Sequence, residues 1–314
     1  MEKLLKILSR EELTAFTLCS LYDEFGYSKY RMSKFEEYDL YVKNKDFLVS
    51  ENVITFTDTD GKLMALKPDV TLSIIKNSKD NLDQAMKVYY NENVYRVSKG
   101  THSFKEIMQA GLECLGVIAD ETITEVLYLA GKSLDLISEN NALEISHLDI
   151  VSGVLDFFNI SYTGKKEIFN YLGEKNVQGV LTVCDNEKLD SEGKKVVEKL
   201  VTLYGTPDKV LPELESFRVN EVVGRAIDQL SNIIKSLDLY GISEKLWIDF
   251  SVVNDMKYYN GLAFKGFIEG LPSGILSGGQ YDSLMQKMKK KSQAIGFAVY
   301  LDELSKLPLN DKGE

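Results

Sequence analysis

The chain has 314 residues, 44% of them hydrophobic and 27% charged, which is the balance of a globular protein with a sizeable core. Its net charge of −11 argues against a nucleic-acid partner, because binding phosphates needs a basic footprint; we interpret the one dense lysine run, at 286–292, as a solvated segment. No apolar run approaches the roughly 20 residues of a membrane-spanning helix. Three scattered cysteines and two histidines argue against disulfides and a histidine-based metal site, so we expect a cytoplasmic protein.

The first half of the sequence predicts helices and strands in alternation. Apolar residues recur at helical spacing over 4–26, and residues 53–66 alternate around an Asp-Gly turn that is typical of a β-hairpin. A Pro-Asp pair near the start of 66–77 predicts a helix whose first amides are capped by Asp69 or Thr71. The other elements expected here are strands at 85–97, 103–117 and 143–150 and a helix over 121–138.

The pattern of predicted elements changes in the second half of the sequence. From about 152 to 240, short helical patterns are broken by Gly and Asp, and we interpret the stretch at about 155–240 as a helical insertion. Strands resume at 246–253, 261–270 and 273–282, and we expect a final helix over 296–304. Strands and helices do not alternate in regular βαβ units, which favours an α+β fold. The sequence thus predicts a single domain over residues 1–314.

Five short blocks follow one another along the chain. They are "LKPDVT" (66–71), "NVYRVSKGTHSFKEIMQAGLECLG" (93–116), "VVNDMKYYNGLAF" (252–264), "SGGQYDSL" (277–284) and "AIGFAVYLDEL" (294–304). In this order they resemble the motifs of the catalytic core of histidyl-tRNA synthetase, a class II aminoacyl-tRNA synthetase. The resemblance covers roughly residues 1–305 and implies an antiparallel sheet flanked by helices. The family also has a C-terminal anticodon-binding domain, which we do not expect here, because the sequence ends about ten residues after the last block.

Several positions depart from the family pattern. Activating an amino acid with ATP requires cations on the phosphates, because charge develops there as pyrophosphate leaves. The resemblance places Arg96 where the family has its α-phosphate arginine, but Glu303 where it has its γ-phosphate arginine. Ser98 replaces the acid that reads adenine, and Asn254 replaces a catalytic arginine. We therefore expect no catalytic residues, no cofactor and no aminoacylation activity.

The amino-acid pocket of the family is better retained. Carboxylates suit an α-ammonium group, Gln and Tyr suit an imidazole, and an arginine suits a carboxylate, so the set fits a small cationic amino acid. Taken singly, each of these residues would be interpreted as an ordinary packing residue or a solvent-facing polar residue. Only their joint occurrence supports a pocket. The residues that the resemblance assigns to a histidine-like pocket, with no metal, are Asp69, Thr71, Arg96, Gln109, Glu113, Tyr258 and Tyr259.

A synthetase core without adenylation chemistry resembles the regulatory subunits of short-form ATP phosphoribosyltransferase, the first enzyme of histidine biosynthesis. The resemblance implies a non-catalytic subunit that is needed for full activity of the catalytic subunit and for feedback inhibition by histidine. It implies a hetero-octamer with that subunit, and self-association as a dimer through an aromatic-rich segment near 11–42. Two alternatives remain: a divergent amino-acid-activating ligase, against which Glu303 argues, and a stand-alone histidine-binding module.

Overall fold

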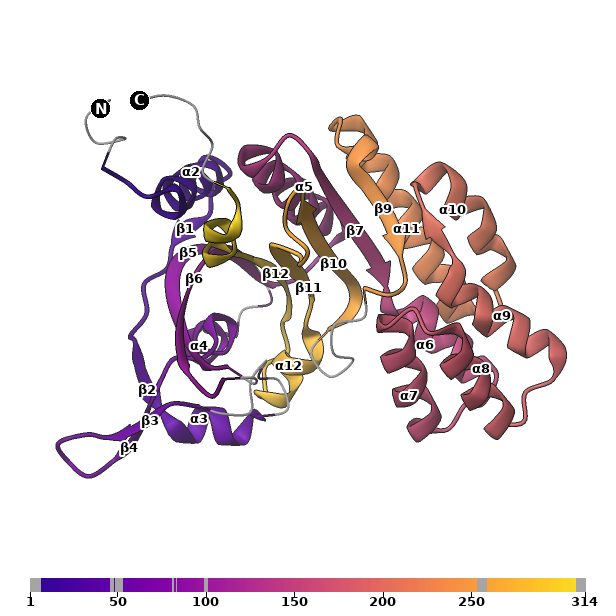
Figure 1. Cartoon of the computed structure of the whole chain (residues 1–314), viewed down its shortest axis with the longest axis horizontal. Coiled ribbons are helices and arrows are strands. Elements are labelled where there is room, and N and C mark those ends of the chain that lie inside the picture. Colours follow the sequence, from indigo (N-terminus) through magenta and orange to yellow (C-terminus); the bar gives the residue numbers. More distant parts are fainter. Residues whose placement is uncertain are drawn as a thin grey trace.

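The fold is built on a large mixed sheet, with a separate three-stranded sheet beside it (Figure 1). The structure, a computed structural model, describes residues 7–45, 48, 53–80, 82, 84–98, 101–252 and 259–308. Within these residues the large sheet has the spatial order β1 (Ser28–Lys29), β5 (Met86–Val97), β6 (Phe104–Gly116), β12 (Gln293–Tyr300), β11 (Leu276–Gln280), β10 (Asn260–Ile268), β7 (Asn141–His147), β9 (Leu246–Asp249) and β8 (Tyr204–Gly205). Neighbouring strands are antiparallel except for β1–β5 and β7–β9.

The two faces of this sheet have different cover. Helices α2 (Arg10–Glu24) and α5 (Asp120–Ile137) pack on one face, against β5, β6, β7, β10 and β12. Buried Leu112 and Phe297, paired across β6 and β12, belong to this core. Because side chains alternate along a strand, Glu113 and its partner Gly296 lie on the opposite face. That second face is where the candidate site forms.

Smaller elements cover the second face. Its apolar cluster joins α4 (Val70–Asn77) and α12 (Asp282–Lys287) to side chains of β5 and β6, among them Tyr90. The three-stranded sheet, in the order β2 (Phe35–Glu37), β4 (Leu63–Leu66) and β3 (Thr55–Thr57), continues into α3 (Tyr38–Lys43). The predicted hairpin is confirmed, with Gly61 in the left-handed region at φ +82° in its turn. Asp69 caps α4 as predicted, since its Oδ1 accepts from the amide of Leu72 at 2.8 Å.

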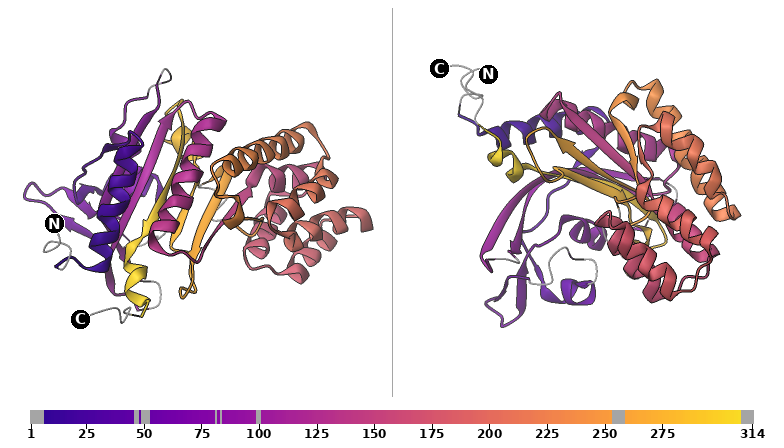
Figure 2. Two further views of the ribbon diagram at one scale, coloured as in Figure 1. Left: turned by 90° about the horizontal axis from the view of Figure 1, so that it is seen from above. Right: turned by 45° about the vertical axis from the view of Figure 1, so that its right-hand side comes forward.

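Helices follow one another through the region that the sequence marked as helical. Figures 1 and 2 place them together on the β7–β9 side of the sheet. In chain order they are α6 (Leu148–Phe157), α7 (Tyr162–Gly173), α8 (Val177–Asn186), α9 (Ser191–Thr202), α10 (Pro207–Leu214), η2 (Glu215–Phe217), α11 (Glu221–Leu239) and η3 (Ser243–Lys245). Side-chain caps at Ser161, Asn176, Asp190 and Asn220 start four of them, which explains the polar breaks in the sequence pattern.

The prediction of a final helix over 296–304 is wrong. Residues up to Tyr300 form β12, which pairs with both β6 and β11, and only then does a 3₁₀ helix, η4 (Leu301–Lys306), begin. An apolar run of this length fits a buried strand as well as a buried helix, so its pattern alone cannot separate the two. The strand predicted over 143–150 also ends early, at His147, where α6 begins. No helix in the described part of the chain is both long and apolar enough to cross a membrane.

A buried ion pair holds the segment that leads into α4. The side chain of Lys67 has no exposed surface, and its Nζ lies 2.8 Å from Oε2 of Glu92 on β5. Burial lowers the pKa of Lys67, and Glu92 raises it again in part. The carbonyl of Lys67 also accepts from the amide of Tyr95 at 2.8 Å. Since Pro68 and Asp69 follow directly, this pair fixes where α4 meets the large sheet.

We expect the substitution Lys67→Met to lower the free energy of unfolding by about 2–4 kcal/mol, because it leaves Glu92 unpaired, although 18% of that side chain remains exposed. The double variant Lys67→Met/Glu92→Leu removes both charges and should recover most of the loss. Urea unfolding monitored by circular dichroism measures both values. Equal destabilisation of the single and double variants would show that packing of the lysine stem, and not the ion pair, is what matters.

Candidate functional site

Glu113 on β6 is the centre of the candidate site. Only 2% of the residue is exposed, and both carboxylate oxygens are hydrogen-bonded. The hydroxyl of Thr71 on α4 donates to Oε1 at 2.6 Å, and the hydroxyl of Tyr281 donates to Oε2 at 2.5 Å. Burial raises the pKa of Glu113 to about 8; the two hydroxyl donors oppose this rise and the nearby Asp69 adds to it. Burial thus favours the neutral acid, whereas the two hydroxyl donors favour the carboxylate.

Glycines on the neighbouring strands make room for the carboxylate. Gly296 stands directly opposite Glu113, and a Cβ added there would lie 1.8 Å from Oε2 of Glu113. Gly279 continues the same row on β11, and a Cβ there would lie 2.6 Å from the ring of Tyr259. No other residue type fits either position without moving a group of the site. The glycines of these strands thus form a flat floor beneath Glu113 and Tyr259.

Asp69 and Arg96 form a second polar pair beside Glu113. Burial raises the pKa of Asp69, while its hydrogen bond from Leu72 and the charge of Arg96 lower it. Arg96 on β5 donates through Nε to the carbonyl of Pro68 at 3.0 Å, which draws the start of α4 towards β5. A guanidinium and two buried acids therefore lie close together on one face of the sheet.

Gln109 and a set of tyrosines complete this face. Gln109 lies on β6 four residues before Glu113, so it faces the same side, and only 3% of it is exposed. It pairs across the sheet with Tyr300 of β12, whose pKa is raised by burial and lowered by the charge of Arg96. Burial likewise raises the pKa of Tyr259, which lies close enough to Glu113 to interact with its charge.

Six of the seven residues predicted from the sequence thus lie on one face of the sheet and near one another. They are Asp69, Thr71, Arg96, Gln109, Glu113 and Tyr259. Tyr258 lies outside the described residues. The sequence reasoning missed Tyr281 and Tyr300, although both stand inside blocks that carried the resemblance; the tyrosine just after the Gly-Gly pair was the available signal. Whether these residues bind an amino acid stays a prediction.

The positions that depart from the family pattern have local partners. Glu303 on η4 accepts from Nζ of Lys306 at 2.6 Å and from the hydroxyl of Ser273 at 2.9 Å. Burial raises the pKa of Glu303, but these two donors more than offset it and the pKa is lowered, so the position carries a negative charge. The amide of Ser98 donates to the carbonyl of Ser103, closing the loop between β5 and β6. Asn254 lies outside the described residues.

Metal ligation has no support in this part of the molecule. Among the residues whose structure is described, no group of three or more His, Cys, Asp and Glu side chains is placed to hold a metal ion. The groups that the site offers are buried acceptors at Glu113 and Asp69, a guanidinium at Arg96, and hydroxyl and amide groups around them, a set that can bind a small polar ligand.

Comparison with known proteins places this geometry in context. A family model described as histidyl-tRNA synthetase matches residues 4–304. An ATP phosphoribosyltransferase regulatory subunit from Oceanobacillus iheyensis is 28% identical over 283 residues, which cover 89% of this chain and 69% of the relative. Another, from Caldanaerobacter subterraneus, is 28% identical over 300 residues, covering 94% of this chain and 78% of the relative.

Solved structures agree on the fold. An ATP phosphoribosyltransferase regulatory subunit/histidyl-tRNA synthetase from Bacillus halodurans C has a TM-score of 0.82 and 24% identity, and the match covers 96% of this chain and 81% of that one. A chain of the ATP phosphoribosyl transferase (HisG:HisZ) complex from Thermotoga maritima has a TM-score of 0.72 and 18% identity, with 94% and 98% covered. The predicted α+β fold of the class II synthetase core is confirmed. The matched family model includes every residue of the candidate site, and the chain belongs to the histidyl-tRNA synthetase family.

Proposed function

We propose that this chain is a non-catalytic regulatory subunit of ATP phosphoribosyltransferase in histidine biosynthesis. Relatives that match about nine-tenths of the chain carry that name, and one structural neighbour comes from a complex of the transferase. The observation that carries the proposal is a contrast within one fold. The amino-acid side of the synthetase site keeps its residues, whereas the triphosphate side has Glu303 in place of an arginine.

The charge at Glu303 is the main argument against aminoacylation. A synthetase lowers the barrier to adenylation by placing cations where phosphate charge develops. At this position the chain instead has a carboxylate, and its nearest cation, Lys306, is already paired with it at 2.6 Å. Ser98 removes the acid that would read adenine. Both changes weaken ATP binding in the synthetase manner, while the contacts around Glu113 are untouched.

Histidine is the effector that we propose for the retained pocket. The α-ammonium group would lie near Glu113 and Asp69, the carboxylate near Arg96, and the imidazole near Gln109 and the tyrosines. Inhibition requires that histidine bind the less active assembly more tightly, and by linkage the active assembly must then bind histidine more weakly. A coupling of about 1–3 kcal/mol would give a 5–150-fold effect.

The assembly that we propose is a dimer of this chain that joins the catalytic subunit in a hetero-octamer in the cytoplasm. The N-terminal third supplies exposed aromatic and aliphatic side chains that suit an interface core. Among them are Phe16, 56% exposed on α2, and the edge-to-face pair Phe35 and Phe56 on the three-stranded sheet.

Adding this chain to a short-form transferase subunit should restore its activity, because the regulatory partner is needed for the active assembly. The two purified proteins should co-elute, and light scattering should give the mass of a hetero-octamer, against a dimer for this chain alone. Transferase activity that is the same with and without this chain, together with separate elution, would refute the proposed function.

Histidine binding should strengthen as the pH rises towards 8. Glu113 is mainly protonated below its pKa of about 8, and an α-ammonium group beside it favours the carboxylate, so binding releases a proton. As the pH rises towards this pKa, the group alone lowers the Kd by at most about tenfold per pH unit, and the gain levels off once the pH exceeds the pKa. Calorimetry in two buffers of different ionisation enthalpy measures both the Kd and the proton release.

Glu113→Gln is the matched control for that experiment, because the imidazole of histidine itself titrates equally with both proteins. The variant should bind histidine about tenfold more weakly and lose the additional pH slope. In the assembled complex, Glu113→Gln and Gln109→Ala should raise the histidine concentration needed for inhibition and leave the uninhibited activity near normal. Unchanged inhibition in both variants would move the effector site elsewhere and leave the regulatory role standing.

Pyrophosphate exchange with histidine, ATP and magnesium should be undetectable, because Glu303 repels the triphosphate. The positive control is an active histidyl-tRNA synthetase under the same conditions. Calorimetry with ATP and magnesium should likewise show no micromolar binding. Exchange above background would support the divergent ligase instead.

A further inference from the structure

Strand β10 has a two-residue bulge beside the candidate site. Along this strand Asn260 pairs with Gln280 of β11, but Ala263 pairs with Gly279, so the register shifts between them. The two residues between Asn260 and Ala263 therefore have no residue opposite them on β11. Bulges are frequent next to functional sites, because the extra residues change where the neighbouring side chains point.

The bulge decides which residue of β10 stands opposite Tyr281. In an antiparallel pair, the residue before one partner stands opposite the residue after the other. The pair before the bulge thus brings Tyr259 opposite Tyr281, whose hydroxyl donates to Glu113 at 2.5 Å. If the register past the bulge continued unbroken, Gly261, which has no side chain, would take that place. The bulge therefore brings two tyrosines together on the side of the sheet where Glu113 lies.

The side chain of Gln280 stabilises the bulge from β11. Only 6% of Gln280 is exposed, and its Oε1 accepts from the backbone amide of Leu262 at 2.9 Å. The side chain thus supplies an acceptor for an amide that the bulge takes out of register with β11. Gly261 has φ +62°, in the left-handed region, and a Cβ there would lie 2.3 Å from the same Oε1. Glycine fits this position because the amide of Gln280 occupies the space of a side chain.

The side chain of Asn260 ties the start of the bulge to α12. Its Oδ1 accepts from the backbone amide of Asp282 at 2.7 Å, and its Nδ2 donates to Oδ2 of Asp282 at 3.1 Å. Oδ1 of Asp282 accepts in turn from the amide of Ala294 on β12 at 2.9 Å. Asn260 directly follows Tyr259, and Asp282 directly follows Tyr281. These hydrogen bonds therefore fix the backbone next to both tyrosines.

We propose that Gln280 and Asn260 are positioning residues for the candidate site: together they hold the bulge of β10, and the bulge holds Tyr259 opposite Tyr281. Both residues act through the tyrosine and not by contact with a ligand. The ring of Tyr259 lies against Gly279, where an added Cβ would be 2.6 Å from it. The consequence for histidine rests on the proposed function, whereas the position of the ring does not.

The amide of Gly279 reports where the ring of Tyr259 lies. The sequence has a single Gly-Gly pair, so glycine labelled with ¹³C at the carbonyl and ¹⁵N at the amide selects the Gly279 signal in a TROSY-HNCO spectrum of the full chain. Gln280→Met removes the acceptor, and Tyr259→Leu removes the ring. The shift caused by Gln280→Met should be smaller in the Tyr259→Leu background, because displacement of the ring then contributes nothing. Equal shifts in the two backgrounds would overturn the proposal.

Histidine affinity, measured by calorimetry, is the second readout. Gln280→Met and Asn260→Ala should each weaken histidine binding about tenfold, and Gln280→Glu, which keeps an oxygen acceptor, should bind within about twofold of the wild type. If Gln280→Met does not fold, Asn260→Ala takes its place in the Gly279 measurement.

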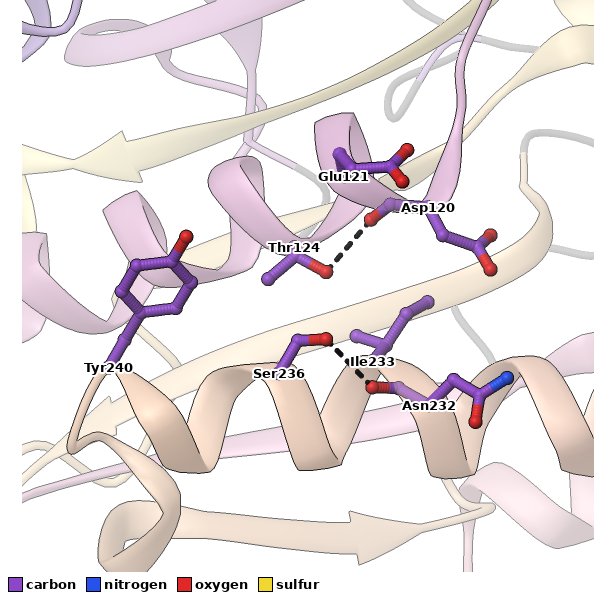
Figure 3. A pocket seen from close by; sticks show the side chains of 7 residues that line it. All are labelled: Asp120, Glu121, Thr124, Asn232, Ile233, Ser236 and Tyr240. Atoms are coloured by element: carbon purple, nitrogen blue, oxygen red, sulfur yellow. Dashed lines mark hydrogen bonds between the residues drawn. The ribbon is translucent and has the colours of Figure 1, made fainter.

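Gln229→Met is the matched control, because it makes the same change on α11, the helix that Figure 3 shows against α5. It should leave the Gly279 signal and the histidine affinity unchanged. Equal weakening of binding by Gln229→Met and Gln280→Met would also overturn the proposal. A wild-type chain that does not bind histidine would refute the proposed effector, and the Gly279 measurement would still decide whether Gln280 and Asn260 position Tyr259.

Discussion

The hydrogen bonds of Thr71 and Tyr281 to the buried carboxylate of Glu113 are the contacts on which the candidate site depends. They join α4, β6 and the segment before α12, which are far apart in the sequence. Taking this acid out of water is unfavourable for its charged form, and burial accordingly raises its pKa. Three other features hold this arrangement in place. Glycines on β11 and β12 leave room for the carboxylate, and Arg96 donates a hydrogen bond to the segment at the start of α4. The Lys67–Glu92 ion pair anchors the same segment to β5.

The proposed loss of adenylation concerns the opposite side of the same site. Recognition needs only complementary groups held in place, and the candidate groups come from β5, β6 and the start of α4. Adenylation needs positive charge at the phosphates, and under our proposal the carboxylate at position 303 opposes it. Lys306 and Ser273 stabilise the carboxylate where it stands, so the acid is part of the local structure.

Much of this could be predicted from local sequence, and the failures have physical causes. The cap at Asp69 and the hairpin around Gly61 each depend on residues near in sequence, and both were predicted correctly. The end of β12 was not, because a short apolar run looks alike in a buried strand and a buried helix. The candidate pocket was predicted through motif order alone. Tyr281 was missed because its hydrogen bond to Glu113 joins residues 168 positions apart in the sequence, and no local pattern reveals such a contact.

Gly296 shows how little free space the candidate site leaves around Glu113. The space beside it that a single methyl group would fill is the space occupied by an oxygen of Glu113. The strand itself is a central one, held on both sides by β6 and β11, and the same methyl group would also lie 2.5 Å from the backbone carbonyl of Leu112. A larger residue there would therefore disturb both the acid and the pairing of β12 with β6. A change confined to this position would therefore alter the middle of the sheet, while the outer surfaces of the molecule keep their residues.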